Sequence, residues 1–234
     1  MQDSLYRIRI VSKGLANLSE DVAFVGGAVV PLYADDPAYS DIRPTIDVDC
    51  IIEINSRILY IELEARLRKL GFINDQQAGA PICRWIYQGV TVDIMPTSSE
   101  ILGFSNQWYK MGMAKRILKE IETGIQVFLL PLPYFLATKL EALKNRGGTD
   151  LRASQDFEDI IFLFDNCSAL EEQALNHEDA DLKTYLENSC MEFLVNPHIR
   201  ESVATALPYG EEARTGLILD KMRNIAYQST QQKR

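Results

Sequence analysis

The segment TIDVDCIIEI, residues 45–54, constrains the fold more than any other stretch of this sequence. β-Branched and apolar residues alternate there with polar ones, which predicts a β-strand. Asp47 and Asp49 are two positions apart, so they should project from one face of that strand. Three residues should point the other way, into the core: Ile46, Val48 and Cys50. Two carboxylates side by side in an apolar strand need a partner, because unpaired carboxylates repel each other and resist burial.

A pair of glycines precedes this strand, in VGGAVV at residues 25–30. Gly26 and Gly27 have no Cβ, so their backbone N–H groups can approach phosphate oxygens closely. If AVVPLY opens a short helix, the helix N-terminus adds a favourable dipole for an anion. The alternative is a turn that requires positive φ. The sequence contains neither a Walker loop nor a GxGxxG dinucleotide motif.

A third acid, Asp93, lies in another β-branched stretch, VTVDIMP. If this strand lies beside the first one, three carboxylates converge on one patch of the sheet. A divalent cation would relieve their repulsion, and hard oxygen ligands select Mg²⁺ or Mn²⁺. Three acids can hold two ions and so clamp a phosphoryl centre. Each aspartate taken alone can equally well cap a turn or face solvent.

The remaining pattern predicts two lobes. Strands are expected at 22–26, at 125–130 and on both sides of a tight turn at Gln88-Gly89 within 82–96. The apolar spacing of 56–72, which includes Ile58 and Ile61, predicts a helix that ends at Gly71. Later helices are expected at 134–146, 154–166, 181–195, 198–206 and 211–226. A strand-bearing lobe, residues 1–130, is therefore expected to precede a helical lobe, residues 131–234.

The charge of the chain limits the kinds of macromolecule that it is expected to bind. The net charge of −9 and the pI near 4.8 argue against non-specific binding to nucleic acid. Residues 110–146 nevertheless hold seven basic and three acidic side chains. This local excess suits a polyanion such as RNA, or simply a solvated helix face.

The chain is expected to be cytoplasmic. Met1 is followed by the polar QDSLYRIR, so no signal peptide is predicted, and no apolar run is long enough to span a bilayer. The cysteines are widely separated, which argues against zinc binding and favours free thiols in a reducing compartment. They are Cys50, Cys83, Cys167 and Cys190.

The order of these motifs resembles the DNA polymerase β-like nucleotidyltransferase superfamily: a strand, Gly26-Gly27, Asp47-x-Asp49 and a later Asp93. RPTIDVD at 43–49, together with LPLPYFLATKLEALKNRGGTDLRASQDFEDIIFL at 130–163, resembles the AbiEii-type nucleotidyltransferases, many of which are toxins of bacterial toxin–antitoxin systems. The resemblance covers roughly residues 22–165. It implies an α+β nucleotidyltransferase fold, a short mixed sheet flanked by helices, followed by a helical C-terminal lobe.

The resemblance also implies an activity and a set of roles. The enzyme would transfer a nucleoside monophosphate from an NTP to a hydroxyl of RNA or tRNA, of a protein, or of a small molecule. Asp47, Asp49 and Asp93 would bind Mg²⁺ or Mn²⁺, and Asp93 would also help to deprotonate the acceptor. The nucleotide would be contacted by Gly26, Gly27, Arg43, Thr45, Lys139 and Asp156.

Lys139 would neutralise the leaving phosphates, and Asp156 would orient Lys139 or contact the base or ribose. A cognate antitoxin is a further expected partner, and no membrane is expected. The alternative is a non-catalytic nucleotide sensor or interaction module that keeps the same fold.

Overall fold

The computed structural model describes residues 2–36, 45–146 and 150–231. The chain divides into two compact units, of which the first comprises Met1–Leu32 and Ile42–Pro131, and the second Tyr33–Asp41 and Leu132–Arg234. Each unit is described by itself. No helix within the described residues is both long enough and apolar enough to cross a membrane.

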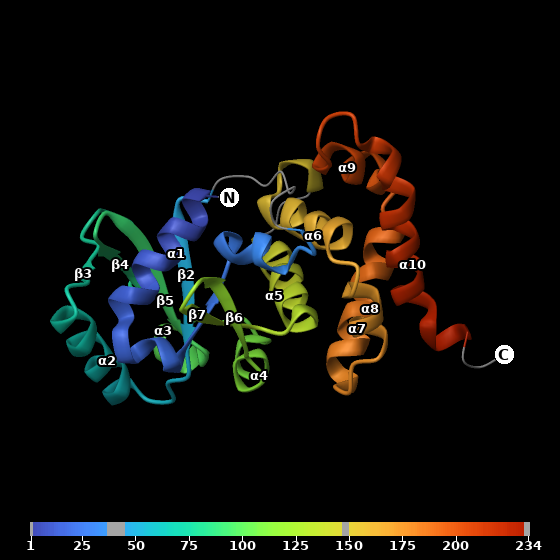
Figure 1. The fold of residues 1–234 in the computed structure, drawn as a ribbon. Coiled ribbons are helices and arrows are strands. Elements are labelled where there is room, and N and C mark those ends of the chain that lie inside the picture. The colour runs from blue at the N-terminus through green and yellow to red at the C-terminus, as the bar shows by residue number, and fades with distance from the viewer. Residues whose placement is uncertain (1, 37–44, 147–149, 232–234) are drawn as a thin grey trace. The chain divides into compact units, whose positions relative to one another are not determined.

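The first unit is built on a mixed sheet (Figure 1). Its strands in the described part of the chain are β1 (Val22–Val25), β2 (Asp47–Ile52), β3 (Ile73–Asn74), β4 (Arg84–Tyr87), β5 (Val90–Pro96), β6 (Ile117–Glu122) and β7 (Ile125–Leu129). They lie in the order β3-β4-β5-β2-β1-β7-β6. The pairs β2–β5 and β1–β7 are parallel, and the other neighbouring pairs are antiparallel. The mixed α/β architecture agrees with the expected class.

Helical segments complete this unit. They are α1 (Gln2–Leu15), η1 (Ala16–Asp21), η2 (Gly27–Tyr33), α2 (Arg57–Lys69), α3 (Ser99–Leu102) and α4 (Tyr109–Ala114). Helix α1 packs on the sheet beside Tyr87, whose ring would lie 2.3 Å from a Cβ on Gly14. Phe72, just after α2, stacks on the same ring with centroids 4.3 Å apart. The face of β4 that carries Tyr87 is therefore covered by helix. The residues that alternate with Tyr87 along β4, Arg84 and Ile86, belong to the opposite face.

The predicted strand at 45–54 forms, but it begins later than the alternation suggested. β2 starts at Asp47, and Val48 and Cys50 are fully buried as expected. The prediction for Ile46 is wrong, because its side chain is 73% exposed. Ile46 precedes the paired part of the strand, and its carbonyl accepts a hydrogen bond from Nη1 of Arg7 at 2.6 Å.

The predicted helix at 56–72 also forms, with a different buried face. Its buried side chains are those of Tyr60, Leu63 and Leu67, whereas Ile58 and Ile61 are 70% and 63% exposed. The hydroxyl of Ser56 caps the helix by accepting from the N–H of Leu59, and the helix then buries the i, i+3, i+7 stripe that contains the tyrosine.

The tight turn between β4 and β5 has the conformation that its residues favour. Gln88 and Gly89 have φ of 47° and 78°, as the two central residues of a type I′ hairpin turn require. Tyr87 therefore pairs with Val90, and Arg84 with Asp93. This register positions the candidate site.

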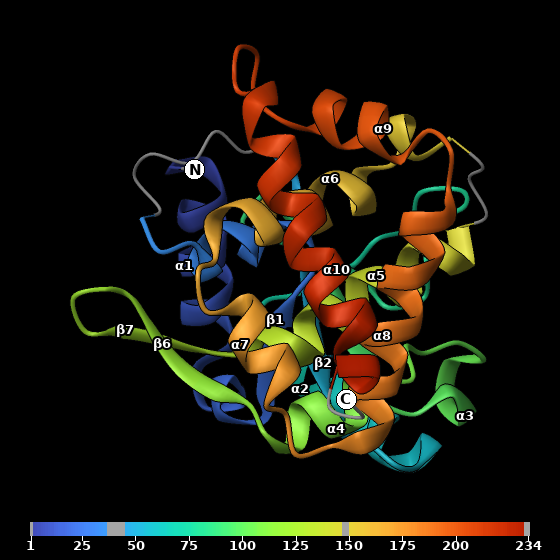
Figure 2. The same cartoon turned by 90° about the vertical axis from the view of Figure 1, so that its right-hand side faces the viewer.

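The second unit is helical (Figure 2). Its elements are α5 (Leu132–Arg146), η4 (Leu151–Ala153), α6 (Gln155–Asn166), α7 (Leu170–Leu175), α8 (Ala180–Val195), α9 (Ile199–Ala206), η5 (Glu212–Arg214) and α10 (Thr215–Gln231). α5 is buried along most of its length, and aromatic contacts such as the edge-to-face pair Phe157–Phe193 fill the core. The helices expected from periodicity are present. Helix α7, like α1, β3 and β6 of the first unit, was not anticipated.

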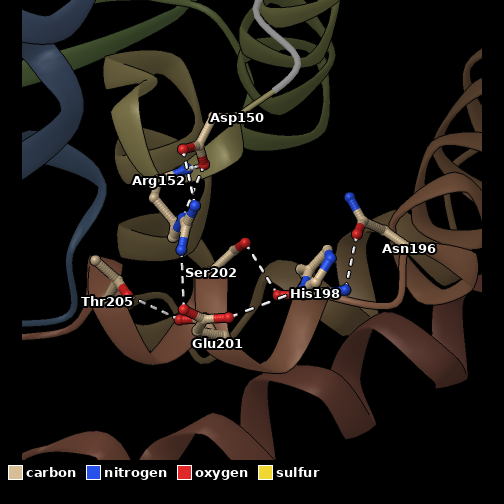
Figure 3. A network of polar contacts seen from close by, with 7 residues as sticks. All are labelled: Asp150, Arg152, Asn196, His198, Glu201, Ser202 and Thr205. Atoms are coloured by element: carbon tan, nitrogen blue, oxygen red, sulfur yellow. Dashed lines mark hydrogen bonds and ion pairs between the residues drawn. The ribbon is translucent and has the colours of Figure 1, made fainter.

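An exposed polar network joins η4 to α9 within this unit (Figure 3). The carboxylate of Asp150 accepts from the backbone and the guanidinium of Arg152, and Nη1 of Arg152 reaches Oε1 of Glu201 at 2.9 Å. The hydrogen bonds from Arg152 hold the pKa of Asp150 below its usual value. The network is open to solvent, so we expect it to contribute little to the stability of the unit.

Candidate functional site

A row of polar side chains crosses the centre of the sheet. Asp49 on β2 lies opposite Val25 on β1 and beside Asp93 on β5, and Asp93 in turn lies opposite Arg84 on β4. Paired neighbours share a face of a sheet, so Asp49, Asp93 and Arg84 project together. Asp47 is two residues before Asp49 and shares this face. We call Asp47, Asp49, Asp93 and Arg84 the acidic row.

Gly26 lies directly against the acidic row. It has φ of +74°, and a Cβ atom placed on it would lie 1.9 Å from Oδ2 of Asp49. A side chain at this position would occupy the space of that carboxylate. Both the backbone conformation and the close approach therefore require glycine. Gly27 is the first residue of the short helix η2, so the expected helix is present, and the positive φ of Gly26 fits the alternative of a turn as well.

Arg84 binds Asp93 through both carboxylate oxygens. Nε of Arg84 donates to Oδ1 at 2.8 Å, and Nη2 donates to Oδ2 at 2.7 Å. The two side chains are 28% and 11% exposed, so the pair borders solvent without being fully desolvated. These hydrogen bonds raise the pKa of the Arg84 guanidinium above its ordinary value. A bidentate, charge-assisted pair of this kind is among the stronger polar contacts in proteins.

Arg84 was not among the predicted site residues, although the sequence contains a signal for it. A two-residue turn at Gln88-Gly89 makes Tyr87 and Val90 a pair, and counting back along the hairpin then places Arg84 opposite Asp93. A basic residue directly opposite an aspartate on the neighbouring strand indicates a cross-strand ion pair.

The acidic row does not fit a three-carboxylate metal centre in the arrangement observed. Within the described residues, no group of three His, Cys, Asp or Glu side chains is placed to hold a metal ion. Asp93 accepts hydrogen bonds from Arg84 through both of its carboxylate oxygens. The predicted binding of Mg²⁺ or Mn²⁺ stays a prediction.

The negative field of the row reaches the cysteines packed beside it. Burial raises the pKa of the Cys50 thiol well above its ordinary value, and the charges of Asp49 and Asp93 raise it further. Burial, followed by the charge of Asp93, raises the pKa of Cys83 to about 11, against a smaller lowering by Arg84. All four cysteines are buried thiols that form no disulfide within the described residues, as expected for Cys50.

Lys139 and Asp156 belong to the second unit, where they form a buried ion cluster. Nζ of Lys139 lies 2.7 Å from Oδ2 of Asp159 and 3.7 Å from Oδ1 of Asp156. Nη1 of Arg146 lies 2.7 Å from Oδ2 of Asp156. Lys139 is 6% exposed, and both aspartates are 3% exposed. Lys139 is thus a buried, paired ammonium rather than an exposed helix lysine, and its predicted contact with nucleotide stays a prediction.

The remaining residues predicted to contact the nucleotide are Thr45 and Arg43. Thr45 is buried and lies just before β2. Arg43 lies outside the described residues. The basic stretch 110–146 does not form a continuous set of exposed cations, since Lys139 is buried, Arg146 pairs with Asp156, and Lys144 pairs with Glu192.

A cavity of about 460 Å³ lies elsewhere in the first unit. Its walls come from the residues that follow β2 and from one face of α2, among them Ile52, Asn55, Leu63 and Arg66. It is at the end of β2 opposite to Asp47, so it is separate from the acidic row.

No protein-family model matches this sequence, and no curated protein matches it either. Among solved structures, the chain is similar to a candidate nucleotidyltransferase from H. pylori. The two share 12% sequence identity over 99% of this chain and 98% of that chain, with a TM-score of 0.45. A score of this size carries no argument about activity, and the AbiEii-type assignment stays a prediction from the motifs.

Proposed function

We propose that the first unit is the catalytic lobe of a nucleotidyltransferase, which transfers a nucleoside monophosphate from an NTP to a hydroxyl acceptor. The observation that carries the proposal is the juxtaposition of Asp49 with Gly26 on one side and with Asp93 on the other. A glycine backbone beside a carboxylate pair combines the two features that a bound triphosphate with its cation needs: donors for phosphate oxygens, and acids for the cation.

In this proposal Asp47 and Asp49 would hold Mg²⁺ or Mn²⁺, which supplies positive charge at the reacting phosphate. Gly26 and Gly27 would donate backbone N–H groups to the phosphates, with Arg43 and Thr45 as further contacts. Asp93 would help to remove the proton of the attacking hydroxyl. Lys139 and Asp156 remain proposed contacts of the nucleotide, and Lys139 is paired with Asp159 and Asp156 with Arg146.

The acceptor and the partners form part of the same proposal. RNA such as tRNA, a protein side chain and a small molecule all offer a hydroxyl. A role as the toxin of a toxin–antitoxin pair predicts that the chain binds the product of a neighbouring gene and that its transfer activity then falls.

The test uses the full chain with Mg²⁺ or Mn²⁺ and each α-labelled NTP in turn, offered total RNA, cell protein or a metabolite extract. We expect label to enter one of these fractions. Transfer should fall by about 100-fold or more in Asp47→Asn and Asp49→Asn, because metal-site residues further from the ion already contribute 10–100-fold. Glu53→Gln is the matched control, since Glu53 is an exposed carboxylate just beyond the end of β2.

Two results would contradict the proposal. Transfer that survives in both aspartate variants would show that the acidic row is not the active centre. Nucleotide that binds tightly but never leaves the NTP pool with any acceptor would favour the non-catalytic sensor instead.

A further inference from the structure

The cavity beyond the end of β2 is lined by acids and bases, none of which forms an ion pair with another described residue. Its volume of about 460 Å³ falls within the range of about 300–1,000 Å³ that small-molecule sites occupy. Every residue of its lining belongs to the first unit. We infer that this cavity binds a small zwitterion with an apolar side chain, such as an apolar amino acid or a dipeptide of such residues. This inference goes beyond the proposed function and does not depend on it.

Helix α2 carries two acid–base couples with the same spacing, and only one of them forms an ion pair. Oε2 of Glu64 lies 3.2 Å from Nη2 of Arg68, four residues later. Glu62 and Arg66 have the same spacing and the same order, which ordinarily favours a pair. They form no ion pair with each other or with another described residue, and both line the cavity. The helix therefore presents an acid and a base separately to the same space.

A second base of the lining, Arg116, is held by neutral groups. Its Nη1 donates to the carbonyl of Met113 at 3.2 Å, and its Nη2 donates to the carbonyl of Glu20 at 3.1 Å. The guanidinium also lies over the ring of Phe128, 4.8 Å from the centroid. None of these contacts neutralises its positive charge. The cavity therefore has a held positive group in addition to Arg66, and both attract the anionic end of a ligand.

Apolar side chains form the buried part of the lining. Ile52, Leu63 and Met113 are 5%, 4% and 2% exposed. They come from the end of β2, from α2 and from α4, so this apolar surface forms only when the unit is folded. An apolar side chain that enters the cavity leaves water for these contacts, which is favourable. The ligand should therefore have an apolar part as well as charged groups.

The acids of the lining indicate the charge at the other end of the ligand. They are Asp21, Glu53 and Glu62. No group of three His, Cys, Asp or Glu side chains in the described part of the chain is placed to hold a metal ion. An ammonium group needs no such fixed set of ligands and can pair with a single carboxylate. A ligand with only one sign of charge would meet side chains of the same sign. A zwitterion instead pairs its carboxylate with Arg66 and its ammonium with the acids.

The test measures binding to the full chain by isothermal titration calorimetry, with leucine, methionine, phenylalanine and the dipeptide leucyl-phenylalanine as probes. Three analogues each lack one feature of the tightest probe: its carboxamide lacks the negative charge, its N-acetyl derivative lacks the positive charge, and glycine lacks the apolar side chain. We expect at least one probe to bind with a Kd of about 1 mM or below. Each analogue should bind at least about tenfold more weakly.

Variants of α2 locate the binding in the cavity. Arg66→Gln and Glu62→Gln should each weaken binding by about tenfold or more, because a hydrogen bond to a charged group of the ligand is lost. Leu59→Trp should also weaken it, because Leu59 lines the cavity and is 44% exposed, so the larger side chain takes up part of the space.

The same helix offers matched controls. Arg68→Gln and Glu64→Gln remove the paired arginine and glutamate, neither of which lines the cavity. Ile61→Trp enlarges a side chain that is 63% exposed and lies outside the lining. All three should bind the probe as the wild type does. Urea unfolding curves identify any variant that fails to fold, and the exposed substitution Arg66→Gln keeps the test if Leu59→Trp does not fold.

The outcomes decide the inference without reference to the acidic row. A probe whose binding weakens in the three cavity variants and in none of the controls would support it. If no probe binds at about 10 mM, the inference is overturned. Equal affinity in Arg66→Gln and the wild type would overturn it as well, as would a carboxamide that binds as tightly as its acid. None of these variants alters the acidic row, so the transfer of label tests the proposed function separately.

Discussion

The two units each hold a group of acids and bases, and the two groups differ in burial. In the second unit, Lys139 and Asp159 are 8% and 4% exposed at their side chains, and with Arg146 and Asp156 their formal charges cancel. In the first unit, the Arg84 and Asp93 side chains are 28% and 11% exposed, and Asp47 and Asp49 lie on the same face of the sheet. A buried ion cluster of this kind is expected to serve stability, whereas partly open carboxylates are accessible to solvent and to ligands.

Lys139→Met should give the largest effect and tests whether the cluster of the second unit is structural. Removing one partner of a buried ion pair costs about 3–5 kcal/mol of the free energy of unfolding. In this variant the buried carboxylate of Asp159 loses the ammonium 2.7 Å away, whereas Asp156 keeps Arg146. Urea unfolding of the variant and the wild type measures the difference.

Two further variants sharpen this result. Lys144→Met, on the same helix, removes an exposed lysine paired with Glu192 and should cost no more than about 1 kcal/mol. Lys139→Met combined with Asp159→Asn removes equal and opposite charges and should recover part of the loss. A Lys139→Met protein of normal stability that fails to bind NTP would show instead that Lys139 serves the nucleotide.

Gly26→Ala should come next and tests the contact between the glycine turn and the acidic row. Alanine at positive φ is strained by about 1–2 kcal/mol, and its Cβ would also fall 1.9 Å from Oδ2 of Asp49. We expect the variant to lose stability and also Mn²⁺ affinity, measured by thermal unfolding and by titration.

Gly79→Ala is the control, because Gly79 has φ of +86° but nothing within 4 Å of its Cβ position. It should show the conformational strain alone and bind Mn²⁺ as the wild type does. Equal Mn²⁺ affinity in the two variants would mean that Gly26 does not support the row.

A smaller effect is expected at alkaline pH and reports the field of the acidic row. The pKa of Cys83 is raised from 9.0 to about 11 in the folded protein. The folded state therefore holds its thiol proton more tightly than the unfolded state, so this contribution to stability is complete below pH 9 and is lost as the pH rises towards about 11. Urea unfolding between pH 8 and 11 should show the decline, and Cys83→Ser should show a shallower one. Identical slopes for both proteins would contradict the raised pKa of Cys83.

The smallest effect is expected for Arg152→Ala, which removes the centre of the exposed network in Figure 3. Solvent and salt screen such contacts, so the urea midpoint should stay within the error of the measurement. A loss as large as that of Lys139→Met would mean that exposure is not what separates the two kinds of ion cluster.

Local pattern predicted the elements better than it predicted their faces. The alternation around Asp47 gave a strand, and the apolar spacing around Leu63 gave a helix, because both signals depend on neighbours a few residues away. Ile46 and Ile58 were misplaced because burial depends on where a strand begins pairing and on which side of a helix the rest of the unit lies. Short elements such as β3 form through pairing with another strand, here β4. Their own few residues carry no pattern that predicts this pairing.

For the candidate site, the sequence by itself determined the acids and the glycines: the two-residue spacing of Asp47 and Asp49 places both on one face of a strand, and Gly26 suits a positive φ. Only the tertiary structure decided their neighbours. The pairing of β2 with β5 brought Asp93 beside Asp49, and the hairpin brought Arg84 onto Asp93. The packing of α5 and α6 enclosed Lys139 between two aspartates. The physical reason is that the backbone conformation is a local property, whereas the charge that meets a carboxylate depends on which distant strand or helix packs against it.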